Sequence, residues 1–132
     1  MSCFINPVKE QRCLCLSCEG EVQPQDLAVM GYEARRRAKA RRWCRIMVDI
    51  THLRSRLTPP QLLDFAEILA GQAPRRGRLA FVVRRDHARQ LGWAANVALR
   101  SGLCLAYFRD ARKAVRWITP AKAPARRKLE LA

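Results

Sequence analysis

The sequence predicts an α/β fold with a single mixed, mainly parallel sheet of four to five strands and about four helices. Short, β-branched apolar segments alternate along the chain with longer segments whose apolar residues recur at helical spacing. The connections are short, as in right-handed βαβ units, which place successive strands in parallel. The length of 132 residues suits one domain without internal repeats. We expect this domain over residues 1–119, followed by a basic, flexible C-terminal tail over 120–132.

The first elements are expected to be two antiparallel strands, a helix and a buried strand. Residues 4–8 and 12–18 form the strand pair, and the second of them alternates leucine with cysteine. A helix is expected over 24–43, where apolar residues recur at helical spacing: Leu27, Met30, Ala34 and Ala38. Residues 45–51 (RIMVDIT) are β-branched and apolar, which is typical of a strand covered on both faces.

The rest of the chain predicts helices and strands in alternation. Each helix begins at a side chain that can accept from its first N–H groups, namely Thr58, Asp86 and Asp110. Pro59 suits the first turn, because a proline has no N–H there to leave unsatisfied. The expected elements are a helix over 58–71, a strand over 79–83, a helix over 86–102, a strand over 103–108 and a helix over 110–118.

Positive charge dominates the composition. The chain has 26 Lys and Arg against 11 Asp and Glu, a net charge of 26 − 11 = +15. Of these cations 21 are Arg, a bias that a GC-rich genome also produces, so the charge indicates acidic partners and no particular function. No apolar run approaches the ~20 residues of a transmembrane helix. The start, MSCFINPVKEQR, lacks an apolar signal segment, so we expect a cytoplasmic protein whose six cysteines are thiols.

Four stretches of the chain, in their order and spacing, resemble the SpoIIAA-like branch of the STAS-domain superfamily. They read LCLSCEGEVQPQDL, IMVDIT, RLAFVVRRDHARQLG and CLAYFRDARKAVRWI. The last resembles a hallmark of the family, a strand ending in a Phe-Arg-Asp-type turn before a helix with a terminal Trp117-Ile118 pair. The resemblance spans roughly residues 4–118. It implies a small non-enzymatic domain that regulates partners or binds small ligands.

Thr58 occupies about the place where anti-anti-sigma members of the superfamily carry a phosphorylatable Ser. Those proteins have an Asp-Ser-Ser-Gly-like segment there, whereas this chain has LTPPQ and lacks the Asp and Gly neighbours. A phosphate on Thr58 would meet the helix N-terminus, Arg54 and Arg56. The other interpretation, which the sequence favours, is that Thr58 is a plain N-cap.

Ligands of open parallel sheets usually lie beyond the carboxyl ends of the strands. Three such ends carry His or Arg, and we hypothesise that they bind one anionic group through Thr51, His52, Arg84, Arg85, His87 and Arg109. The competing interpretation, again favoured, treats Asp86 and Asp110 as helix caps and the arginines as solvated.

Three cysteines form a C-x-C-x-x-C motif: Cys13, Cys15 and Cys18. Zinc would need a fourth ligand, and the other cysteines and the two histidines supply no paired second half. Strand alternation sends neighbouring side chains to opposite faces, so we expect buried or half-buried thiols and no metal. The chain also lacks a Gly-rich phosphate loop, a nucleophile elbow and an H-E-x-x-H motif. We therefore expect a non-enzyme without a cofactor.

The densest positive charge lies mainly on the first long helix: Arg35, Arg36, Arg37, Lys39, Arg41 and Arg42. This basic patch could follow a phosphate backbone with Trp43 available for stacking, or it could be a solvated helix face. The leading hypothesis is a STAS/SpoIIAA-like regulatory or interaction domain that binds a protein partner or a small anionic ligand. The alternative is a basic nucleic-acid-binding accessory protein. Weak, non-specific nucleic-acid binding at low salt is expected in either case.

Overall fold

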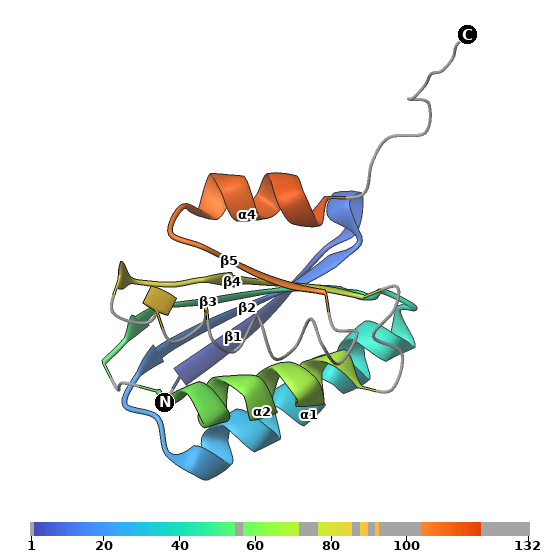
Figure 1. Ribbon diagram of the computed structural model, residues 1–132. Helices are drawn as coiled ribbons and strands as arrows, with labels where there is room; N and C mark the ends of the chain where they lie inside the picture. Colours follow the sequence, from blue (N-terminus) through green and yellow to red (C-terminus); the bar gives the residue numbers. More distant parts are fainter. Residues whose placement is uncertain are drawn as a thin grey trace, which may run out of the picture.

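One mixed sheet of five strands, in the order β1-β2-β3-β4-β5, organises the structure (Figure 1). The computed structural model describes residues 2–54, 57–71, 77–85, 88–89, 92 and 104–119. β1 is antiparallel to β2 and the remaining neighbours are parallel, which confirms the predicted mixed, mainly parallel sheet. The strands are β1 (Ser2–Val8), β2 (Cys13–Gly20), β3 (Arg45–Leu53), β4 (Arg78–Val82) and β5 (Leu105–Phe108).

The described residues contain three α-helices, one fewer than expected. They are α1 (Pro24–Ala40), α2 (Pro59–Ala70) and α4 (Ala111–Ile118), and a short 3-10 helix, η1 (Lys9–Gln11), connects β1 to β2. The fourth expected helix, over 86–102, falls mostly outside the described residues, although helical backbone is described at Arg85, Ala88, Arg89 and Gly92.

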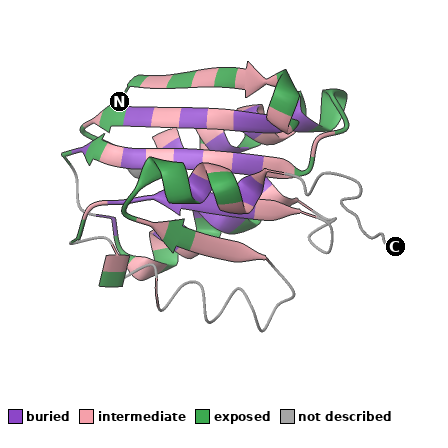
Figure 2. Cartoon of the chain, turned by 90° about the horizontal axis from the view of Figure 1, so that it is seen from above, coloured by how far each residue is buried: buried purple, intermediate pink, exposed green. Residues whose placement is uncertain are grey.

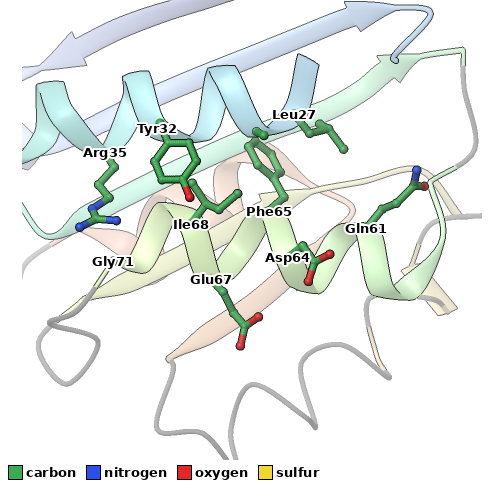
Figure 3. A pocket seen from close by; sticks show the side chains of 10 residues that line it. Leu27, Tyr32, Arg35, Gln61, Asp64, Phe65, Glu67, Ile68 and Gly71 are labelled. Atoms are coloured by element: carbon green, nitrogen blue, oxygen red, sulfur yellow. The ribbon is translucent and has the colours of Figure 1, made fainter. Parts of the chain in front are cut away.

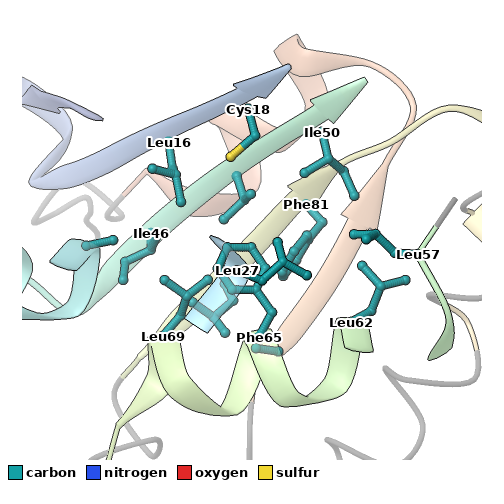
Figure 4. Close-up of a cluster of buried hydrophobic side chains, with 14 of the residues drawn as sticks. Leu16, Cys18, Leu27, Ile46, Ile50, Leu57, Leu62, Phe65, Leu69 and Phe81 are labelled. Atoms are coloured by element: carbon teal, nitrogen blue, oxygen red, sulfur yellow. The ribbon is translucent and has the colours of Figure 1, made fainter. Parts of the chain in front are cut away.

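The helices lie on both faces of the sheet (Figure 1). α1 and α2 connect successive parallel strands with the same hand, so they pack on the same face, which we call the α1–α2 face. α4 follows the last strand and lies on the opposite face, the α4 face. The main core is on the α1–α2 face, where strand residues such as Leu16 and Ile50 meet Leu27 of α1 and Leu62 of α2 (Figure 4).

Close packing of α1 on α2 depends on a glycine. A Cβ atom on Gly31 of α1 would lie 2.8 Å from Cγ2 of Ile68 and 3.2 Å from the ring of Phe65, both on α2. Phe65 in turn packs edge-on against Phe81 of β4, with ring centroids 6.1 Å apart. Gly31 thus lets the two helices approach while the Phe65 ring reaches the sheet.

The α4 face is only partly covered. Its smaller core contains Ala114 and Ile118 of α4 over Ala80 and Val82 of β4. Trp117 packs on Phe108 and beneath the Arg78 guanidinium, which also donates to the Trp117 carbonyl at 2.8 Å. α4 lies over β3, β4 and β5, and no described helix covers β1 and β2 on this face (Figure 2). β3, which we expected to be covered on both faces, is therefore fully buried only toward α1 and α2.

Candidate functional site

The carboxyl ends of β3, β4 and β5 meet at one edge of the sheet, as the sequence hypothesis requires. Asp49, Val82 and Phe108 are level with one another in the parallel register. The Val83 N–H donates to the Phe108 carbonyl at 2.8 Å, so β4 and β5 stay paired up to the points where Arg84 and Arg109 follow. Arg84 and Arg109 therefore follow the ends of neighbouring strands. Arg84 is half-buried, whereas Arg85 and Arg109 are exposed.

Thr51 and His52 both lie at the carboxyl end of β3, which continues to Leu53, two residues beyond its expected end. His52, which we expected directly after the strand, is therefore its penultimate residue. A register shift between β2 and β3 falls at this point, because Ser17 pairs with Asp49 whereas Glu19 pairs with His52. The Thr51 N–H and hydroxyl both donate to Oδ1 of Asp49, at 2.9 and 2.6 Å. His52 is exposed, and His87 lies outside the described residues.

Two carboxylates beside these strand ends, those of Asp49 and Asp110, accept hydrogen bonds from local donors. Asp49 accepts the two hydrogen bonds from Thr51. Asp110 caps α4 by accepting from the Arg112 N–H at 2.9 Å, which confirms the cap interpretation for this residue, whereas Asp86 is outside the described residues. The N-terminus of α4 also lies at this edge, and the first N–H groups of that helix carry partial positive charge. At the ends of β4 and β5 the described residues include three arginines and one carboxylate, that of Asp110. The carboxyl edge, defined here by Arg84, Arg85 and Arg109, therefore favours an anion electrostatically.

Thr58 caps α2, as the favoured interpretation predicts. Its hydroxyl accepts from the Gln61 N–H at 3.3 Å, and the Gln61 side chain accepts from the Thr58 N–H at 2.8 Å. This reciprocal pair is a capping box. The exposed Arg54 lies near Gly20, and Arg56 is outside the described residues. Phosphorylation of Thr58 stays a prediction.

The residues of the basic patch lie in different environments and contact different groups. Glu33 holds two of its members, binding Arg36 at 2.6 Å and Arg37 at 2.7 Å, and these hydrogen bonds lower the pKa of Glu33 to about 2. Arg35 instead packs against Gly71 at the end of α2, where its guanidinium is 2.7 Å from the place a Cβ would occupy. These three consecutive arginines therefore do not form one continuous anion-binding stripe.

The last two members of the patch lie beyond the helix that we expected to carry them. α1 ends at Ala40, and Arg42 adopts a left-handed conformation with φ of 60°. The Arg41 guanidinium lies 5.4 Å from the centre of the Trp43 ring. Trp43 thus already has a cation over one face, and Lys39 is exposed. Two further groups of basic residues in the sequence, Arg75-Arg76 and Arg126-Arg127-Lys128, are outside the described part of the chain.

A groove between α1 and α2 was not predicted from the sequence. It has a volume of about 490 Å³ and combines Tyr32 and Arg35 of α1 with Asp64 and Glu67 of α2 (Figure 3). Periodicity alone places each of these residues on an outer helix face, and the groove arises only when the helices pack at the distance that Gly31 allows. The sequence feature that could have indicated the groove is an aromatic residue on the otherwise polar outer face of α1, Tyr32, whose exposed fraction is 57%.

The cysteine motif is divided between the two faces of the sheet. Cys13 is in the small core of the α4 face, with the half-buried Cys15 packed against it. Cys18 belongs to the main core of the α1–α2 face, and the half-buried Cys3 packs against that core. Among the described residues, no three His, Cys, Asp or Glu side chains come together where a metal ion could bind.

Comparison with known proteins gave no match. No protein-family model matches the chain, and no curated protein matches it at a significant level. None of the described helices combines the length and apolar character needed to cross a bilayer.

Proposed function

We propose that the chain is a non-enzymatic, STAS-like interaction domain that recognises an anionic group at the carboxyl edge of its sheet. The observation that supports the proposal is the imbalance of charge at this edge. Arg84, Arg85 and Arg109 follow the adjoining strands β4 and β5, and Asp110 is the one carboxylate among the described residues at those two strand ends. The resemblance of the sequence to the SpoIIAA-like branch supports a regulatory rather than a catalytic role.

The chemistry of the edge suits a carboxylate or a phosphate. A guanidinium offers several N–H donors in a planar fork that matches both anions, and it stays charged at every physiological pH. Partial positive charge at the N-terminus of α4 adds to the field of the arginines. Such an anion can be a free small ligand or the acidic side chains of a partner protein.

The two sources can be separated with two probes. Pyrophosphate and a short peptide of glutamates are titrated separately into the ¹⁵N-labelled protein at physiological salt, and backbone amide shifts are followed. We expect saturable shifts in residues 84–85 and 109–112 with at least one probe. Shifts with pyrophosphate alone indicate a small ligand, and shifts with the peptide alone indicate an acidic partner. Saturable binding of neither probe would contradict the proposal.

A matched pair of double variants tests the location. Arg85→Gln with Arg109→Gln removes two exposed cations from the carboxyl edge. Lys39→Gln with Arg116→Gln removes two exposed cations from the last turns of α1 and α4, at the opposite end of the sheet. We expect the first pair to weaken binding at least about tenfold and the second to change it little. Equal weakening by both pairs would show that only net charge attracts the probe.

A further inference from the structure

Two cysteines from neighbouring strands lie directly opposite one another. Cys3 of β1 is the register partner of Cys18 of β2, and their Sγ atoms share a hydrogen bond of 2.7 Å. We propose that Cys3 and Cys18 are a reversible dithiol–disulfide pair that a peroxide oxidises. The proposal is independent of the anion site at the carboxyl edge.

The backbone geometry permits the bond without rearrangement. Directly opposed residues of an antiparallel pair have Cα atoms about 4.5–5.5 Å apart, within the range of about 4.4–6.8 Å found for disulfides. Both side chains point to the α1–α2 face, since both pack in the main core. Cys13 and Cys15 also share a face, but they are two residues apart on one strand. Their Cα atoms are therefore separated by roughly 6.6–6.8 Å, at the upper limit for a disulfide.

The environments of the two thiols assign them different roles. Cys3 is half-buried on the edge strand, whereas Cys18 is completely buried. The hydrogen bond with Cys18 lowers the pKa of the Cys3 thiol, and the same bond together with burial raises the pKa of the Cys18 thiol. A thiolate is the form that attacks an oxidant. Cys3 is therefore the thiol that reacts first, and Cys18 is the thiol that resolves the product.

The reaction balances with hydrogen peroxide as the oxidant. The Cys3 thiolate attacks one peroxide oxygen, the O–O bond breaks, and the leaving hydroxide takes up a proton to become water. The sulfenic acid formed on Cys3 is then attacked by the Cys18 sulfur. The S–S bond forms, the S–O bond breaks, and the hydroxyl leaves with the Cys18 proton as a second water. The two thiols lose two electrons, and one peroxide is reduced to two waters.

A disulfide between Cys3 and Cys18 would link the edge strand β1 covalently to β2. β1 pairs with β2 on one side only, so its backbone is held to the sheet by a single set of hydrogen bonds. A covalent link at Cys3, near the start of β1, limits the opening of that strand and constrains the unfolded chain. A thiol reductant would reverse the effect, as expected of a disulfide in a reducing compartment.

Peptide mapping after peroxide treatment tests the pairing. Trypsin separates residues 1–9, with Cys3, from residues 13–35, with Cys18. We expect the oxidised protein to lose about 2 Da, to yield these two peptides as one cross-linked species, and to recover its mass with dithiothreitol. The melting temperature should rise by at least about 5 °C on oxidation.

Single variants identify the sulfur atoms. Cys3→Ser should abolish both the cross-link and the rise in melting temperature, and it alters only a half-buried position on the edge strand. Cys15→Ser is the control and should retain both. In Cys18→Ala, a sulfenic-acid trap such as dimedone should label Cys3. The proposal fails if folded wild-type protein gives no cross-link, if Cys15→Ser abolishes it, or if peroxide carries Cys3 directly to sulfinic acid.

Discussion

Thr58 shows how one side chain stabilises the transition from the sheet edge into α2. Its hydroxyl and the Gln61 side chain satisfy two N–H groups that the helix itself leaves unpaired. Thr58→Ala removes the acceptor for the Gln61 N–H, and we expect it to lower the free energy of unfolding by about 1 kcal/mol. Urea denaturation followed by circular dichroism measures the change. Thr58→Ser retains the oxygen and should remain close to wild type, so equal losses in both variants would show that the cap is not responsible.

Glu33 gives the surface of α1 a pH dependence with a definite sign. Hydrogen bonds from Arg36 and Arg37 lower its pKa to about 2, below the value of about 4.3 expected in the unfolded chain. The stabilisation is therefore complete above about pH 4.3 and is lost as the pH falls toward 2. Because all three side chains face solvent, salt screens the interaction and its contribution is small.

The carboxyl resonance of Glu33 provides the direct measurement. In a ¹³C-detected titration at low salt, the midpoint of Glu33 should lie near pH 2, well below the value of about 4.3 for an unperturbed Glu. Arg36→Gln with Arg37→Gln should return the midpoint toward about 4.3. A midpoint that is ordinary in the wild type would contradict the ion pairs.

At the scale of elements, the sequence patterns identified the strand pair, both long helices and the parallel strands. Helix boundaries were predicted correctly where a capping or helix-breaking residue marks them in the sequence, as Thr58 and Gly71 do at the two ends of α2. Boundaries were wrong where tertiary pairing decided them. β3 continues to Leu53 because its last residues pair with Glu19 and Gly20 of β2. A periodicity argument could not detect that pairing, and it therefore ended the strand two residues too early, at Thr51.

The groove between α1 and α2 also depends on a contact that no single helix encodes. Gly31→Ala would improve helix propensity by about 1 kcal/mol, but its Cβ would meet the branched Ile68 side chain at 2.8 Å and Phe65 at 3.2 Å. Overpacking of this kind costs about 1–3 kcal/mol, so we expect a net loss of stability or no gain. Thermal unfolding measures the balance.

Val29→Ala is the control for Gly31→Ala. Val29 is on the same helix and is 67% exposed, so alanine there improves helix propensity without filling space. It should leave stability unchanged or slightly increased. If Gly31→Ala stabilises the protein as much as or more than Val29→Ala does, the two helices have room for the extra methyl group, and Gly31 does not set their distance.

For the whole molecule, the net charge of +15 is distributed without a continuous basic stripe on α1. Glu33 engages two of the three consecutive arginines, and the third packs against α2. A surface that attracts nucleic acid only through net charge owes its affinity to counterion release alone, so that affinity falls steeply as salt rises. This distribution favours the interaction-domain proposal over a dedicated nucleic-acid interface.

We therefore expect binding to a labelled RNA or DNA duplex at about 50 mM salt and none that is measurable at about 200 mM. Arg36→Gln with Arg37→Gln and Lys113→Gln with Arg116→Gln each remove two exposed cations, from helices on opposite faces of the sheet. Both pairs should weaken low-salt binding equally in fluorescence anisotropy, because a polyanion that responds to total charge does not distinguish the faces. Affinity that persists at about 200 mM and is lost only in the α1 pair would establish α1 as a nucleic-acid interface and overturn this interpretation.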